Sequence, residues 1–146
     1  MRKTLWMLAV AAVGLLALAP AAISGESAAP TLTVKSSSYG RVLFDGRGHV
    51  LYAFTRDARG RSACYRACAK AWPPYIAKRA LNPGAGISRA LLGRTTRRDG
   101  RGQVTYAGRP LYLYVGDTKP GQILCQNVAE FGGTWRVVRP SGKLVR

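Results

Sequence analysis

The sequence predicts a mainly β protein: one compact domain of two pseudo-symmetric β-hairpin repeats, with a short helical insert between them. The first observation is a motif, Tyr-x-aromatic-x-x-Asp, which occurs in residues 51–57 and returns sixty positions later in residues 111–117. The second is that a short apolar run and a glycine turn precede each copy. The third is that helical spacing is confined to the stretch between the copies. Two copies are too few for a solenoid or a propeller, so we expect the halves to pack together with approximate two-fold symmetry.

The length of 146 residues allows one domain with a sizeable core. The formal charge is +17, because 23 lysine and arginine residues face only six acidic residues. This charge favours contact with polyanions, and we expect an anionic cell-wall polymer or a membrane surface, although a GC-rich codon bias would produce the same excess of arginine. The composition indicates no specific nucleic acid and identifies no small-molecule substrate.

Residues 1–24 have the three parts of a secretory signal peptide: a basic start, an apolar run over residues 5–19, and a segment of small residues. The run is shorter than the roughly 20 residues that span a bilayer comfortably, which favours cleavage over an uncleaved anchor. No cysteine lies in or just after this segment, so the acceptor for a lipid group is missing. We expect a cleaved, non-lipidated protein that is secreted or resides in the periplasm or cell envelope. Cleavage after Ala21, Ser24 or Ala29 would fit.

Residues 25–38 are rich in Ser, Ala, Thr and Pro, which predicts a flexible N-terminal lead that could end in a strand at 32–35. The duplicated β-rich domain is expected to cover residues 39–146. Its first repeat should contain two strands, 42–44 and 50–54, that pair as a hairpin around Asp45-Gly46. Apolar side chains alternate onto both faces of the second strand, so it should be covered on both sides.

A short helix is predicted over residues 62–72, with the Ser62 hydroxyl as its N-cap and two prolines at its end. The second repeat should contain strands at 104–106 and 111–115, and a last strand should follow Gly132-Gly133 at 135–138.

Together these motifs resemble the secreted repeat family of predicted bacterial lipoproteins that carries the Tyr-x-aromatic-x-x-Asp motif. The likeness covers residues 40 to about 138. Besides the two motif copies, it rests on Gly40-x-Val42-Leu43, on Cys64-x-x-x-Cys68-x-x-x-Trp72-Pro73-Pro74, and on Arg98-Asp99-Gly100-x-x-Gln103-Val104-x-Tyr106. The resemblance implies export, a duplicated β-rich unit and no established activity. The chain departs from the family pattern in lacking a lipidation cysteine and in having Cys125.

Cys64 and Cys68 lie four positions apart and predict a disulfide, because both would lie on one face of a helix in an oxidising compartment. Cys125 aligns with Cys64 across the duplication, so a disulfide from Cys125 to either cysteine is the rival pairing. Three cysteines leave one unpaired within a chain. A thiol-redox or copper(I) site would also use cysteines, and a protein of that kind is the alternative function.

The acidic residue of each motif copy, Asp57 or Asp117, could contribute to a shared cation site or could accept backbone hydrogen bonds in a turn. The turn role is predicted, because two carboxylates alone rarely form a calcium site. The aromatic residues of the motif could form a platform for carbohydrate or nucleic acid, but strand aromatics more often lie in a core. We therefore predict a structural role for six motif residues: Tyr52, Phe54, Asp57, Tyr112, Tyr114 and Asp117.

The sequence does not predict an enzyme, a cofactor or a metal site. His49 is the only imidazole, and neither a Gly-x-Ser-x-Gly elbow nor a Cys-x-x-Cys-His haem motif occurs. The leading hypothesis is an exported cell-envelope module of unknown activity, a non-enzymatic binding or structural protein that favours anionic polymers.

Overall fold

The computed structural model describes residue 29, residues 31–78 and residues 80–146. The predicted signal peptide, residues 1–24, lies outside the described residues.

Strands dominate the regular structure of the described residues, so the prediction of a mainly β fold is confirmed. In the described residues a single short helix is present, and it lies between the two motif copies, where the helical insert was expected. The elements are β1 (Leu32–Ser37), β2 (Gly40–Asp45), β3 (Tyr52–Phe54), α1 (Ala67–Ala71), β4 (Leu92–Thr96), β5 (Gly102–Tyr106), β6 (Arg109–Pro110), β7 (Val128–Glu130) and β8 (Gly133–Val137).

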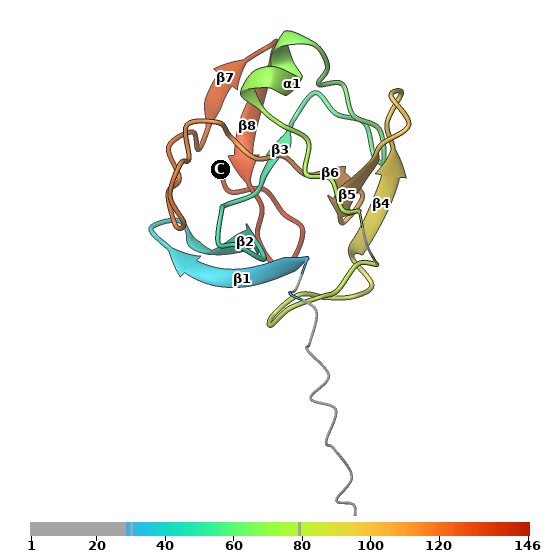
Figure 1. The fold of residues 1–146 in the computed structure, drawn as a ribbon. Helices are drawn as coiled ribbons and strands as arrows, with labels where there is room; N and C mark the ends of the chain where they lie inside the picture. Colours follow the sequence, from blue (N-terminus) through green and yellow to red (C-terminus); the bar gives the residue numbers. More distant parts are fainter. Residues whose placement is uncertain (1–28, 30, 79) are drawn as a thin grey trace, which may run out of the picture.

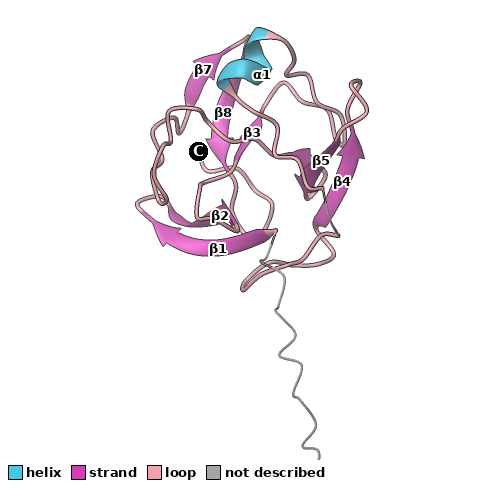
Figure 2. Cartoon of the chain, viewed as in Figure 1, coloured by secondary structure: helices cyan, strands magenta, loops and turns pink. Residues whose placement is uncertain are grey.

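The strands form three small sheets that surround the interior of the molecule (Figures 1 and 2). The first sheet is β1-β2, the second has the order β3-β8-β7, and the third has the order β4-β5-β6. Every pair is antiparallel. In Figure 1, α1 lies beside β7 and β8, on the opposite side of the molecule from the β1-β2 sheet.

Strand β1 begins inside the predicted flexible lead. The strand suggested at 32–35 extends to Ser37 and pairs along its whole length with β2, from Leu32 opposite Asp45 to Ser37 opposite Gly40. Leu32 is fully buried, and Val34, two positions on, also packs against the core. The folded domain therefore starts upstream of position 39, because alternating Leu and Val side chains give this polar segment one apolar face.

The first predicted hairpin is present, but it is short. Asp45 N–H donates to the carbonyl of His49 at 2.8 Å and Leu51 N–H donates to that of Leu43 at 3.0 Å, so the two strands pair only near the turn. Beyond this point β3 leaves β2 and pairs with β8. All three residues of β3 are at most 3 % exposed, which confirms that this strand is covered on both sides.

The second predicted hairpin differs in where its second strand pairs. β6 ends at Pro110, after a turn in which Ala107 and Gly108 both have positive φ. The segment 111–115, expected as a strand, is not a regular strand: Tyr112 forms isolated bridges with Tyr52 and Pro74, and Val115 lies in a turn. Its backbone bonds to the segment that follows α1, since Leu113 N–H donates to the carbonyl of Pro73 and the carbonyl of Leu111 accepts from Tyr75 N–H, each at 2.9 Å.

The helix is shorter than predicted, and Ser62 is not its N-cap. The helix begins at Ala67 after Arg66, whose side chain makes no capping hydrogen bond. Ser62 Oγ instead accepts from the N–H of Cys64 at 3.2 Å. A local serine bond of this kind competes with helix formation, which explains why residues 62–66 are not helical.

Pairing across the duplication is the main feature of the architecture. The motif strand of the first repeat, β3, pairs with β8 at the end of the second repeat. The motif segment of the second repeat pairs with residues 71–75 at the end of the first. Between them, Tyr52 and Tyr112 exchange two backbone hydrogen bonds, each 2.9 Å long. The repeats are therefore interlocked around this tyrosine pair, and neither motif segment completes its pairing within its own repeat.

Two apolar clusters fill the interior, and both contain residues from the two repeats. The first cluster consists of Val42, Phe44, Val50, Tyr52, Phe54, Cys64, Cys68, Trp72, Tyr112, Trp135, Val137 and Val145. The second consists of Leu32, Leu43, Leu51, Ala53, Val104, Tyr106, Leu111 and Val138. The alternation of β3 explains this division, since Tyr52 and Phe54 enter the first cluster while Leu51 and Ala53 enter the second.

Candidate functional site

The motif tyrosine of each repeat binds the motif aspartate of the other repeat. Tyr52 Oη donates to Asp117 Oδ2 at 2.7 Å, and Tyr112 Oη donates to Asp57 Oδ2 at 2.8 Å. Both tyrosines are fully buried. The two bonds join equivalent positions of the two motif copies. The repeated motif therefore gives a reciprocal pair of Tyr–Asp hydrogen bonds, each of which links one repeat to the other.

The second carboxylate oxygen of each aspartate closes a loop. Asp57 Oδ1 accepts from Ala63 N–H at 2.7 Å, and Asp117 Oδ1 accepts from Leu124 N–H at 3.0 Å. The N–H groups of the same aspartates donate to Phe54 and to Tyr114, three residues back, at 3.1 and 3.2 Å. The aromatic-x-x-Asp part of the motif is therefore a turn in both copies, and each side chain closes the longer loop that follows.

The geometry does not bring the two aspartates together as a pair of free ligands, because each carboxylate is occupied by a tyrosine and a backbone N–H. Among the described residues, no group of three His, Cys, Asp or Glu side chains could hold a metal ion.

Burial controls the protonation of this site. Burial raises the pKa of Asp57 to about 6, although the hydrogen bonds from Ala63 and Tyr112 act in the opposite direction. Burial also raises the pKa of Asp117, against the hydrogen bond from Tyr52. The pKa values of both tyrosines are raised, first by burial and then by the neighbouring carboxylate. The phenol groups therefore remain protonated donors at neutral pH.

The third motif position supplies the two ends of a stack of four aromatic rings. Phe54 stacks on Trp135 with a centroid distance of 4.2 Å, and Trp135 stacks on Trp72 at 3.9 Å. Tyr114 packs on the other side of Trp72 at 4.7 Å. The motif tyrosines contact the stack edge-on, Tyr52 against Trp72 and Tyr112 against Trp135. The stack crosses the boundary between the repeats and obeys the same approximate symmetry as the Tyr-Asp bonds.

The symmetry is broken at the two indole N–H groups. Trp72 Nε1 donates to Glu130 Oε2 at 2.8 Å. Trp135 Nε1 is buried and makes no hydrogen bond to any other described residue. The aromatic side chains predicted to fill the seam between the halves thus lie there, but only one of the two tryptophans has its polar group satisfied.

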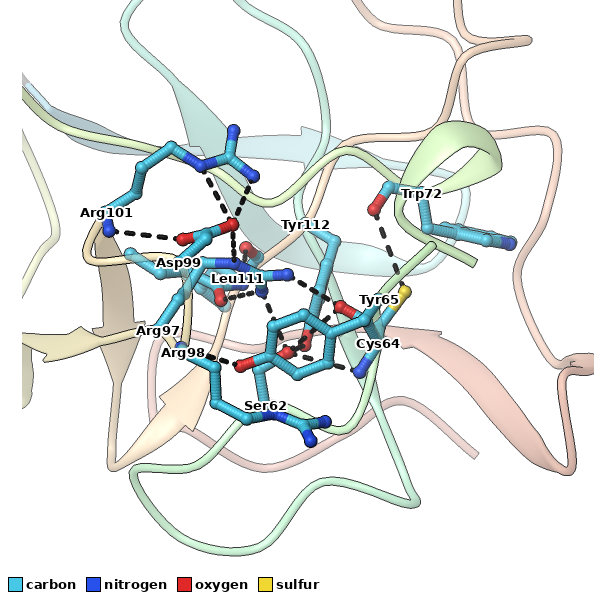
Figure 3. Close-up of polar contacts among 11 residues, drawn as sticks. Ser62, Cys64, Tyr65, Trp72, Arg97, Arg98, Asp99, Arg101, Leu111 and Tyr112 are labelled. Carbon is cyan, nitrogen blue, oxygen red and sulfur yellow. Dashed lines mark hydrogen bonds and ion pairs between the residues drawn. The ribbon is translucent and has the colours of Figure 1, made fainter. Parts of the chain in front are cut away.

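A buried arginine supports the site from the second repeat (Figure 3). Arg97, only 3 % exposed, donates to Ser62 Oγ at 2.9 Å, to Gln103 Oε1 at 2.6 Å and to the carbonyl of Cys64 at 2.7 Å. Ser62 Oγ lies 2.7 Å from Tyr112 Oη, which connects Arg97 to the Tyr112–Asp57 bond. The sequence places Arg97 in a basic turn, and no feature of that turn distinguishes it from the exposed Arg98, so sequence reasoning missed this residue.

Cys64 and Cys68 form a disulfide, with a Cα–Cα distance of 5.3 Å, as the sequence predicted. Cys64 precedes the helix, so the close approach comes from the turn into α1 and not from two positions on one helix face. Cys125 carries the free thiol. Burial raises the pKa of this thiol, and nearby Asp117 and Glu130 act in the same direction. The thiol is therefore protonated at neutral pH, a state that disfavours nucleophilic reactivity.

The acidic residues of the described part all have partners within the chain. Asp45 accepts from the N–H groups of Arg47 and His49, Asp99 pairs with Arg101, and Glu130 accepts from Trp72. The remaining two are the motif aspartates. Most of the carboxylates are thus bound to neutral donors, and few are left to neutralise the arginines and lysines on the surface.

The fold and this site define a class of protein: a duplicated β-rich module whose two copies exchange their motif contacts. The chain belongs to the family described as a secreted repeat of unknown function, whose profile matches residues 33–75 and 93–139. The two matches correspond to the two interlocked repeats. Neither a curated protein nor a solved structure matches the chain. In the part of the chain that the structure describes, no helix has the length and apolar character to cross a membrane.

Proposed function

We propose that the protein is an exported, non-enzymatic module of the cell envelope that binds anionic polymer through its surface cations. The observation that carries this proposal is the charge distribution. The chain has a formal charge of +17, and in the described residues most carboxylates accept from neutral donors, while Asp99 pairs with Arg101. Unneutralised surface cations attract polyanions and raise their local concentration.

A non-enzymatic role is supported by how the motif residues are used. The tyrosines and aspartates that a catalyst would need free are hydrogen-bonded to each other across the repeats. The single imidazole belongs to His49, whose Nδ1 lies 3.8 Å from Asp45 Oδ1 in a hairpin turn. In the described residues no nucleophilic side chain is paired with it. Both arrangements serve the fold and leave no nucleophile–base pair of the kind that hydrolysis requires.

The experiment compares two kinds of ligand for the protein in its exported form. Purified cell-wall fractions and poly(glycerol phosphate) are tested by sedimentation in about 0.15 M salt, where unspecific long-range attraction is screened. We expect the protein to sediment with both. Failure to bind either polymer under these conditions would overturn the proposal.

A copper(I) titration at neutral pH, in the same preparation, tests the alternative of a thiol-redox or copper-handling protein. With Cys64 and Cys68 joined, one thiol per chain is left to bind a soft metal. We expect no stoichiometric uptake. Tight uptake that Cys125→Ser abolishes would favour the alternative.

Export itself is part of the proposal, because the family is described as secreted. We infer that the segment 1–24 is removed and that the mature protein is not lipidated. N-terminal sequencing of the exported protein should find a start between positions 22 and 30. A protein that still begins at Met1 would contradict this inference.

A further inference from the structure

A groove of about 410 Å³ lies between α1 and the turn that joins β7 to β8. Its lining includes two arginines, three aromatic rings and one half of the disulfide: Arg56, Arg66, Phe54, Tyr65, Phe131 and Cys68. No acidic residue lines it. We call this the α1 groove. In Figure 1 the β7–β8 turn lies close to α1, so the two walls come from different repeats.

Phe131 has a conformation and an exposure that the fold does not require. It is the first of the two residues between Glu130 and Gly133 in the β7–β8 hairpin, and its φ is 54°. Asn, Asp or Gly normally occupies this position, because both central residues of such a turn need positive φ. Phe131 is nonetheless an aromatic residue with 37 % of its surface exposed. An exposed ring on a strained backbone is typical of a binding site.

Arg66 is strained in the same groove. Its backbone has φ 52° and ψ −123°, the geometry of a turn position that glycine usually fills. Its guanidinium makes no hydrogen bond or ion pair to the other described residues. Arg56 also lines the groove and donates to the carbonyl of Phe131 at 3.1 Å, which leaves its remaining N–H groups available. The α1 groove thus presents two guanidinium groups without a carboxylate between them.

Tyr65 connects the groove to further positive charge (Figure 3). The guanidinium carbons of Arg97 and Arg98 lie 4.4 and 4.1 Å from the centre of its ring. Burial alone would raise the pKa of Tyr65, but the hydrogen bonds from Arg98 and the charges of both arginines lower it overall. The two guanidinium groups thus place positive charge directly beside the Tyr65 ring.

We propose that the α1 groove binds a phosphodiester polymer, with Arg56 and Arg66 on the phosphate groups and the exposed ring of Phe131 against the carbon backbone. Guanidinium groups match phosphate oxygens with two parallel hydrogen bonds, and the Phe131 ring offers an apolar face beside them. This inference rests on the proposed function and gives it a location and a chemical preference for phosphate over carboxylate.

The test uses two substitutions that relax the backbone while removing the ligand contact. Arg66→Gly and Phe131→Asn each place a residue suited to positive φ, so both variants should melt at or above the temperature of the wild type. We expect Arg66→Gly to weaken binding of poly(glycerol phosphate) about tenfold. Phe131→Asn should weaken it about threefold.

Matched controls remove the same chemistry outside the groove. Arg89→Gln removes one exposed positive charge and is the control for Arg66→Gly. Leu124→Asn removes an apolar side chain that is 59 % exposed and is the control for Phe131→Asn. Both should change binding by less than about twofold, since they alter only the overall charge or surface. Poly-L-glutamate should bind more weakly than poly(glycerol phosphate) and should not distinguish Arg66→Gly from Arg89→Gln.

Three results would overturn the inference. If the wild type binds poly(glycerol phosphate) but the groove variants match their controls, the groove is not the site, while the proposed function stands. If phosphatidylglycerol vesicles bind and the free polymer does not, the partner is a membrane surface. Absence of binding to every anionic probe would contradict the proposed function as well.

Discussion

Asp57 shows how a single carboxylate can be shared between a turn and a distant repeat. It accepts from Ala63 N–H and from Tyr112 Oη, yet burial raises its pKa to about 6. The folded protein therefore holds this proton at pH values where the unfolded chain, with an ordinary aspartate, has already lost it. The resulting contribution to stability is fully present below about pH 4 and is lost as the pH rises through about 6.

This predicts a pH dependence that Asp57→Asn should remove. The free energy of unfolding of the wild type, measured relative to that of Asp57→Asn, should fall by about 1 to 3 kcal/mol between pH 4 and pH 7. Urea denaturation of both proteins at several pH values measures this difference. A difference that stays constant, or that increases with pH, would contradict the pKa assignment.

Arg97 should be intolerant of a conservative change. Its guanidinium reaches Ser62, Gln103 and the carbonyl of Cys64 in different directions, which a single ammonium group cannot reproduce. Arg97→Lys is expected to lower the free energy of unfolding by about 1 to 3 kcal/mol, whereas Arg98→Lys, at an exposed neighbour, should have almost no effect. Equal effects of the two substitutions would show that the buried network contributes little.

At the scale of elements, periodicity and turn residues predicted most of the strands. Residues 42–44, 50–54 and 135–138 are mainly apolar and follow glycine turns, and each contains a strand or bridge in the structure. β1 was expected only in part, because its Ser-rich, polar sequence conceals one buried face. The helix was predicted too long, because Ser62 binds the backbone locally instead of capping a helix.

The pairing of the elements could not be read from the sequence. A hairpin pattern predicts pairing with the nearest strand, but β3 pairs with β8 about eighty residues away. Nothing local in residues 51–57 specifies this partner, which depends on how the two repeats pack. Of the candidate site, the sequence predicted the six structural motif residues and the Cys64–Cys68 disulfide. It missed the buried Arg97, and it did not predict that each motif tyrosine donates to the aspartate of the other repeat.

The disulfide is an element-scale feature with a measurable effect. It closes a loop of about five residues, so the chain-entropy estimate of its stabilisation is only about 2 kcal/mol. Reduction should therefore lower stability by this amount without unfolding the domain, and the native protein should have one free thiol per chain, on Cys125. Peptide mapping without reduction checks the pairing, and a linked peptide that contains Cys125 would contradict it.

At the scale of the whole molecule, the duplication is interlocked. Each motif segment pairs with the end of the other repeat, and the ring stack Phe54–Trp135–Trp72–Tyr114 draws two rings from each. A single repeat would expose these rings and leave one side of its motif strand without a hydrogen-bonded neighbour. Both repeats are therefore needed before either one can complete its fold.

This predicts the behaviour of fragments. Residues 31–86 and residues 87–146, produced separately, should each be unfolded, because the core clusters contain side chains from both parts. Mixed in equal amounts, they should associate and recover the dispersed amide spectrum of the intact protein. A well-dispersed spectrum from either fragment alone would contradict the interlocked arrangement.

The most direct test of the reciprocal Tyr-Asp exchange is a double-mutant cycle. Tyr52→Phe and Asp117→Asn, in different copies of the motif, should couple by about 1 to 2 kcal/mol in the free energy of unfolding, because they remove the two ends of one buried hydrogen bond. Tyr52→Phe and Asp57→Asn, in the same copy, should be additive within about 0.5 kcal/mol. Strong coupling within one copy, with additivity between copies, would contradict the exchange on which this account of the fold depends.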